Sequence, residues 1–104
     1  MLKDDANILY FSPASIWEIV IKKGLGRDDF RVDPARLRKL LVANGYEELA
    51  IEPDHALAVE TLPALHKDPF DRILLAQARC ERLQLLTADC QLVAYGDSVI
   101  SVPD

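Results

Sequence analysis

Apolar residues along the chain fall into two patterns, short dense runs and longer segments with helical spacing. The short runs have the length and composition of buried strands, and they cover residues 8–11, 47–51, 83–87 and 99–102. The helical segments begin at residues 13, 34, 53, 69 and 89, and the first ends at Gly24 or Gly26. Strands that alternate with helices predict an α/β fold, in which helices cover a mainly parallel sheet.

Three of the predicted helices have clear start signals. Serine or aspartate precedes proline at positions 12–13, 33–34 and 68–69, which places a capping residue before a proline in the first helical position. The helix from residue 69 is apolar on nearly every side, so we expect most of its surface to be buried.

Length and charge limit the possible functions. The 104 residues suit one domain, 1–104, and no segment approaches the roughly 20 apolar residues of a membrane span. We therefore expect a cytoplasmic protein with no membrane partner. Seventeen acidic and twelve basic residues argue against general DNA coating. They still fit a nuclease whose carboxylates hold metal ions, because a bound cation inverts the local charge.

Cys80 and Cys90 form no disulfide framework and are expected as reduced, packed thiols.

Three carboxylates are candidates for chemistry, because ligands of parallel α/β sheets bind beyond the carboxyl ends of the strands. Asp89 follows the strand at 83–87, Asp71 lies in the first turn of the buried helix, and Glu18 lies about two turns into the first helix. If the three converge, their mutual repulsion requires a counterion. A hard divalent cation such as Mg²⁺ or Mn²⁺ would supply it.

Each acid also has a purely structural interpretation, and the sequence leaves both open. Asp71 can complement the positive end of its helix dipole, and Asp89 can cap the helix that follows it. Glu18 can belong to a capping box or pair with Lys22 at i,i+4 spacing. Asp68 is most simply a helix cap.

The other possible functional residues are better explained by ordinary structural roles. His55 and His66 lack the spacing of zinc ligands and are expected on the surface or in loops. Trp17 lies on an apolar helix face and is expected in the core. The basic cluster at 22–27 could touch phosphates, but a solvated face is the favoured interpretation.

The chain resembles a PIN domain in three segments, SPASIWEIVIKKGLG, DPFDRILLAQA and LLTAD followed by YG. More narrowly, it resembles the VapC-type toxins of bacterial type II toxin–antitoxin pairs, from about Ile8 to the C-terminus. The resemblance implies a PIN-like three-layer fold and a metal-dependent endoribonuclease. By position, Glu18, Asp71 and Asp89 would hold Mg²⁺ or Mn²⁺, which orients or activates water to cleave an RNA phosphodiester. It further implies a homodimer and a VapB-like antitoxin as partner.

One part of the family pattern has no counterpart here. Family members start with a strand that ends in an aspartate and lies in the middle of the sheet, and one or two helices follow it. This chain begins near the second strand, so the resemblance predicts an N-terminally truncated domain. Strands 8–11 and 83–87 would then pair directly, recruit a strand from another chain, or leave a gap. The missing aspartate also gives an alternative function, a degenerate module that binds an antitoxin without cleaving RNA.

Overall fold

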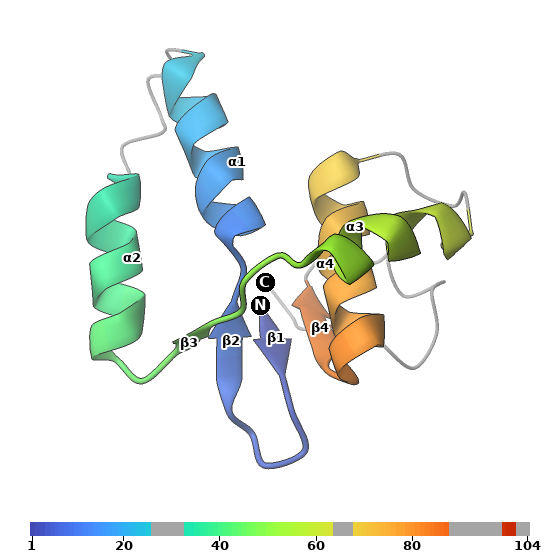
Figure 1. Cartoon of the computed structure of the whole chain (residues 1–104). Helices are drawn as coiled ribbons and strands as arrows, with labels where there is room; N and C mark the ends of the chain where they lie inside the picture. Colours follow the sequence, from blue (N-terminus) through green and yellow to red (C-terminus); the bar gives the residue numbers. More distant parts are fainter. Residues whose placement is uncertain (26–32, 64–67, 88–98, 102–104) are drawn as a thin grey trace.

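A computed structural model describes residues 1–25, 33–63, 68–87 and 99–101 (Figure 1). The helices are α1 (Pro13–Gly24), α2 (Pro34–Ala43), α3 (Pro53–Ala58), the short 3-10 helix η1 (Val59–Thr61) and α4 (Pro69–Glu81). The strands are β1 (Leu2–Lys3), β2 (Leu9–Phe11), β3 (Glu47–Glu48), β4 (Gln84–Thr87) and β5 (Val99–Ser101). These elements confirm the predicted α/β class, while the helix predicted from residue 89 lies outside the described residues. Within the described part of the chain, no helix has the length and apolar character needed to cross a membrane.

The strands form a single sheet in the order β3-β2-β1-β4-β5. β2 pairs with β3, and β4 with β5, in parallel, whereas β1 is antiparallel to both β2 and β4. Four strands therefore run in one direction, and the central strand alone is reversed. The sheet is mainly parallel, as predicted, with this one exception.

The central strand β1 corrects the prediction about the middle of the sheet. Direct pairing of β2 with β4, a borrowed strand and an open gap were all wrong, because the chain's own residues 2 and 3 fill the place. Leu2 pairs with Tyr10 on one side and with Leu85 on the other. The Leu2 side chain is completely buried. This burial stabilises the strand. Two residues are too few to show a periodic pattern, so β1 has no signal in the sequence.

A tight turn makes the reversal of β1 possible. The Asp4 carboxylate accepts hydrogen bonds from the backbone N–H groups of Ala6 and Ile8, both at 2.9 Å. Asn7 adopts the left-handed conformation with φ of 65°, which asparagine tolerates better than most residues. The aspartates and asparagine at positions 4–7 are thus a hairpin signal between β1 and β2.

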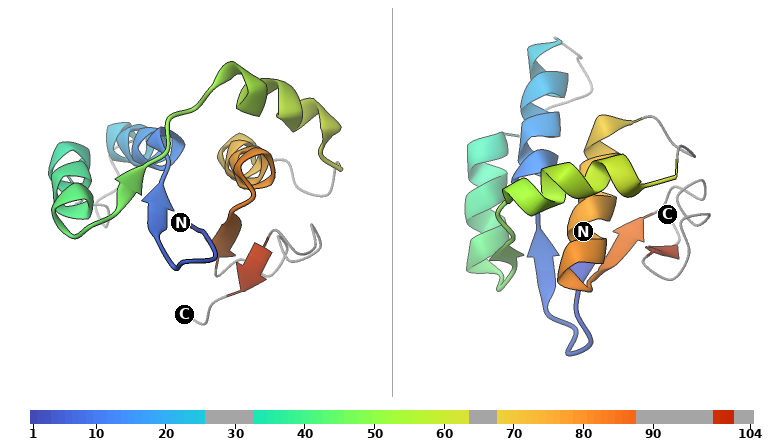
Figure 2. Two further views of the ribbon diagram at one scale, coloured as in Figure 1. Left: turned by 60° about the horizontal axis from the view of Figure 1, so that its bottom comes forward. Right: turned by 45° about the vertical axis from the view of Figure 1, so that its right-hand side comes forward.

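Helix α4 forms the centre of the core. Five consecutive residues, 74–78, are buried, which confirms the helix predicted to be covered on most sides. Their leucine and alanine side chains join Leu2, Leu83 and Leu85 of the sheet region in one apolar cluster. Helix α3 crosses α4 on the side away from the sheet (Figure 2). Helix α4 is therefore enclosed between the sheet and α3.

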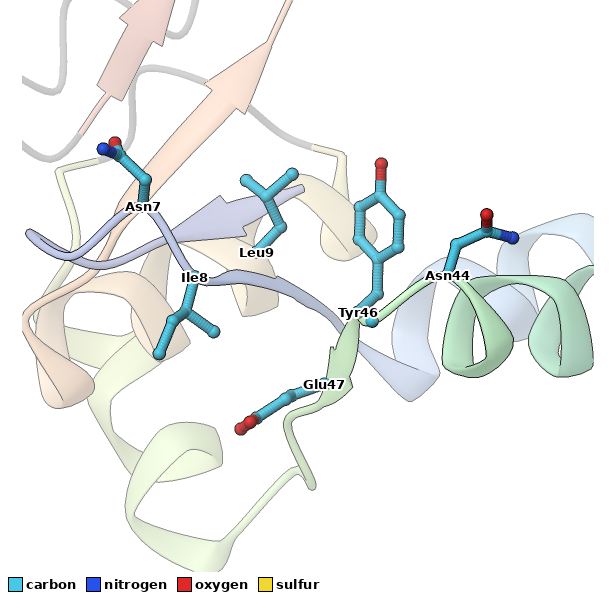
Figure 3. A pocket seen from close by; sticks show the side chains of 7 residues that line it. Asn7, Ile8, Leu9, Asn44, Tyr46 and Glu47 are labelled. Atoms are coloured by element: carbon cyan, nitrogen blue, oxygen red, sulfur yellow. The ribbon is translucent and has the colours of Figure 1, made fainter.

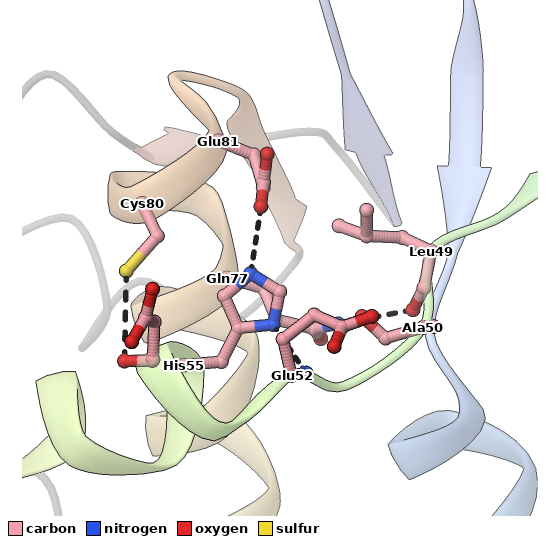
Figure 4. Close-up of polar contacts among 8 residues, drawn as sticks. Leu49, Ala50, Glu52, His55, Gln77, Cys80 and Glu81 are labelled. Carbon is pink, nitrogen blue, oxygen red and sulfur yellow. Dashed lines mark hydrogen bonds and ion pairs between the residues drawn. The ribbon is translucent and has the colours of Figure 1, made fainter.

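His55 of α3 is buried against α4, so the expectation of a surface or loop histidine was wrong. Its Nδ1 accepts a hydrogen bond from the backbone N–H of Glu52 at 2.9 Å, and its Nε2 lies 2.9 Å from a carboxylate oxygen of Glu81 (Figure 4). Since Nδ1 accepts, the proton of the neutral ring is on Nε2 and is donated to Glu81. His55 therefore joins the start of α3 to the end of α4.

Replacing His55 with alanine should lower the free energy of unfolding by about 2–3 kcal/mol. The change leaves the Glu52 N–H without its acceptor and opens a cavity beneath α3. Glu81 is 44% exposed at its side chain, so Glu81→Gln should lower stability by less than about 1 kcal/mol. Urea unfolding of both variants measures the difference. Equal losses would contradict this prediction, because they would mean that neither the cavity nor the unpaired Glu52 N–H has the expected cost.

Helix α1 projects beyond the end of β2 instead of lying over the sheet (Figure 1). Its contacts are with α2 and α4, so one side of its apolar surface remains uncovered. Trp17 is 61% exposed, and the expectation of a core tryptophan was wrong.

Cys80 is also exposed, which corrects the expected packed thiol, while Cys90 lies outside the described residues.

Candidate active site

Two capped helix starts position the candidate acids. Ser12, at the end of β2, accepts a hydrogen bond from the N–H of Ala14 at 3.1 Å and begins α1. Asp68 accepts from the N–H groups of Phe70 and Asp71 at 2.8 and 3.3 Å and begins α4. The predicted cap role of Asp68 is confirmed. These caps fix the directions of the helices that carry Glu18 and Asp71.

Helices α1 and α4 meet through an aromatic pair. The rings of Trp17 and Phe70 have centroids 5.1 Å apart and an interplanar angle of 77°, an edge-to-face arrangement. Glu18 directly follows Trp17, and Asp71 directly follows Phe70. The ring contact therefore holds together the two backbone segments that carry these acids.

Glu18 forms the ion pair that was one of its structural interpretations. A carboxylate oxygen of Glu18 lies 3.5 Å from Nζ of Lys22, one turn later on α1. The two side chains are 28% and 43% exposed, and such a pair contributes only a few tenths of a kcal/mol. A divalent cation would easily compete with so weak a partner for the Glu18 carboxylate.

Asp71 lies at the carboxyl end of β4. The α-amino group of Met1 donates a hydrogen bond to the carbonyl oxygen of Leu86 at 3.3 Å, near the end of that strand. Burial lowers the pKa of this amino group, and the nearby negative charge of Asp71 opposes the shift and raises it. Asp71 therefore lies near the sheet edge at which ligands of parallel sheets bind.

The third predicted acid, Asp89, lies outside the described residues. Within those residues, no group of three or more histidine, cysteine or acidic side chains is arranged to hold a metal ion. β1 adds Leu2 and Lys3 to the centre of the sheet and no carboxylate. Glu18 and Asp71 supply the oxygen donors that Mg²⁺ and Mn²⁺ prefer, so their chemistry fits such a cation. Their role as metal ligands stays a prediction.

An apolar pocket of about 240 Å³ lies where α1 meets α4. It is lined by Ala14, Trp17, Ile51, Pro69, Phe70 and Ile73. Sequence reasoning missed this pocket because it assigned Trp17 to the core. The useful signal was the placement of an aromatic residue directly before each candidate acid, at Trp17-Glu18 and Phe70-Asp71.

A second pocket, of about 330 Å³, lies at the opposite ends of the parallel strands. Its lining comes from the starts of β2 and β3, where Leu9 and Tyr46 extend to one side of the sheet and Glu47 to the other (Figure 3). This pocket is at the amino ends of β2 and β3, whereas α1 leaves β2 at its carboxyl end. It is therefore separate from the candidate active site.

Comparison with known families identifies the family of the chain. The family model of the PIN domain matches residues 2–97, so the chain belongs to the PIN-domain family. PIN domains are generally nucleases, and nuclease-type activity is the class of function that this membership supports. The match includes β1, which the resemblance seen in the sequence from Ile8 onward left out. No curated protein and no solved structure matches the chain.

Proposed function

We propose that the chain is a metal-dependent endoribonuclease, the toxin of a VapBC-type toxin–antitoxin pair. Glu18, Asp71 and Asp89 would hold Mg²⁺ or Mn²⁺ and cleave RNA phosphodiesters. The observation that carries the proposal is the Trp17–Phe70 contact, which joins the helices of two of these acids in a chain of the PIN-domain family. The position of Asp71 at the carboxyl end of β4 supports the same site.

The chain's own residues prepare this site for a cation. Asp68 caps α4 and thereby fixes the first turn, in which Asp71 is held next to the positive end of the helix dipole. Lys22 restrains the side chain of Glu18 in the free protein. When bound, the cation would lower the pKa of its water and neutralise charge on the phosphate.

Protein partners are part of the proposal. A VapB-like antitoxin would bind the toxin, and the toxin would form a homodimer. Exposed apolar side chains on α1 and at its C-terminal cap support a protein partner, since Val20, Ile21 and the cap residue Leu25 are 48%, 40% and 70% exposed. Size measurement of the pure chain by light scattering tests the homodimer, and copurification with a coexpressed antitoxin tests the other interaction.

The central experiment combines RNA cleavage with Mn²⁺ titration calorimetry. We expect cleavage in Mn²⁺ and none in excess EDTA. Glu18→Gln should weaken Mn²⁺ binding by roughly 10- to 100-fold, since even changes around a metal ligand have effects of this size. Glu60→Gln, at an exposed position of η1, is the matched control and should bind Mn²⁺ like the unchanged chain.

Cleavage that persists in EDTA, or that Glu18→Gln leaves unchanged, would contradict the proposed mechanism. Such a result would indicate a contaminating nuclease or different chemistry.

A degenerate binding module is the second candidate function. The observation that favours it is the reversed strand β1, which places Leu2 and Lys3 in the middle of the sheet and contributes no acid there. This candidate predicts stable binding of an antitoxin, no Mn²⁺ binding and no RNA cleavage. The same calorimetry and cleavage assays therefore separate the two functions.

A further inference from the structure

Trp17 is a large apolar residue that is mostly exposed to solvent. It is the only tryptophan of the chain, and 61% of its surface is exposed. Because most of this large ring is exposed, its burial contributes little to the core. Phe70 nevertheless holds the ring in a defined orientation through the edge-to-face contact. An exposed and oriented aromatic ring is suited to bind a ligand by stacking.

The pocket beside Trp17 is suited to a flat apolar group. Ala14, Ile51 and Ile73 provide aliphatic walls, and the two rings provide the aromatic surface, around a space of about 240 Å³. A nucleobase has a flat π-face that stacks on such rings, and this interaction tolerates any base.

The surroundings of the pocket favour a nucleic acid over an apolar peptide. Glu18 and Asp71 directly follow the two rings in sequence, so a base in the pocket would lie beside the proposed metal site. Lys22 and Lys23 lie further along α1, on other sides of the helix from Trp17, so they add positive charge near the pocket without lining it. Their long side chains can meet backbone phosphates. A nucleic acid supplies both a base for the rings and phosphates for these lysines.

We propose that Trp17, held by Phe70, stacks an unpaired base of the RNA substrate and so positions a phosphodiester at the carboxylates. This inference rests on the proposed ribonuclease function and adds a positioning residue to it. The stacked base must be unpaired, because bases inside a duplex are already stacked and unavailable. Since Trp17 acts through stacking, the preference for a particular base would be modest.

The fluorescence of Trp17 tests this proposal directly, because no other tryptophan contributes to the emission. The full chain is titrated in EDTA at low salt with a single-stranded cytidine octamer and with an abasic octamer of the same charge. We expect the cytidine octamer to quench the emission in a saturable way. The abasic octamer should leave the emission unchanged, and equal quenching by both would overturn the proposal.

Variants extend the test to affinity, measured by the fluorescence anisotropy of a dye-labelled octamer. Trp17→Ala should bind the octamer roughly 5- to 150-fold more weakly, the range that stacking of one base supplies. Trp17→Phe should restore most of the affinity. Val42→Ala, on α2 and 53% exposed, is the control and should leave the affinity unchanged.

The outcomes distinguish failure of the stacking proposal from failure of the ribonuclease proposal. If Trp17→Ala binds the octamer and cleaves RNA like the unchanged chain, the stacking proposal is wrong and the nuclease proposal stands. If Trp17→Ala changes only self-association or capture of a protein partner, the pocket takes a protein and the stacking proposal is again wrong. If the unchanged chain neither binds nor cleaves RNA, both proposals fail.

Discussion

We expect the Asp71→Asn variant to cleave RNA at least about 100-fold more slowly than the unchanged chain. Asparagine keeps the size of the side chain but removes the negative charge, so the proposed cation loses one of its carboxylate ligands. Changes that only surround a metal ligand already reduce activity 10- to 100-fold, and loss of a ligand should reach or exceed the upper value. Initial rates of cleavage at saturating Mn²⁺ measure the effect.

The matched control is Asp54→Asn. Asp54 also lies in the first turn of a helix, α3, but it is exposed and lies on a helix that carries none of the candidate ligands. This substitution should leave the cleavage rate within about twofold, as surface changes usually have small effects. Thermal unfolding of both variants shows whether the fold is retained. A folded Asp71→Asn protein with normal activity would remove Asp71 from the proposed site.

The second large effect concerns stability. We expect Leu2→Ala to lower the free energy of unfolding by about 2–5 kcal/mol, the usual range for a buried leucine. Leu2 is fully buried, it belongs to the main apolar cluster, and its strand pairs with both β2 and β4. Truncation would leave a cavity between α4 and the centre of the sheet. Equilibrium unfolding in urea measures the loss.

The same leucine-to-alanine change at Leu57 is the control. Leu57 lies on α3 and is 68% exposed, so Leu57→Ala should change stability by less than about 1 kcal/mol. If the two variants were equally stable, β1 would not be an integral strand of the sheet. The comparison therefore tests directly whether residues 2 and 3 complete the centre of the domain.

Helix boundaries were predictable from the sequence because their signals are local. The caps at Ser12, Asp33 and Asp68 all accept hydrogen bonds from the following turn, as their serine-proline and aspartate-proline pairs indicate. The continuous apolar run of α4 likewise predicted its burial. The family itself was recognisable from three segments, and the family match confirms that recognition.

The features that the sequence did not predict depend on tertiary contacts. β1 has two residues, and its stability comes from neighbours on both sides rather than from a pattern of its own. His55 was expected on the surface or in a loop because it lacks the spacing of a zinc ligand, and its burial involves a contact with Glu81, 26 residues away in sequence. The direction of α1, away from the sheet, decides that Trp17 is exposed, and helical periodicity cannot show which side a neighbour will cover.

The reversed central strand has a consequence for how the protein is made. Met1 and Leu86, which hydrogen-bond across β1 and β4, are 85 residues apart in sequence. At ordinary rates of synthesis, β4 follows β1 by roughly 4–17 s. During that interval only the β3-β2-β1 part of the sheet can form, without the helix α4 that covers its centre and the strand β4 that continues it. The sheet can close only after β4 has left the ribosome, so a shorter nascent chain would not yet have the edge of the sheet near which Asp71 lies. Long-range closure of this kind is slow, and it would delay the assembly of the candidate active site until β4 has been made.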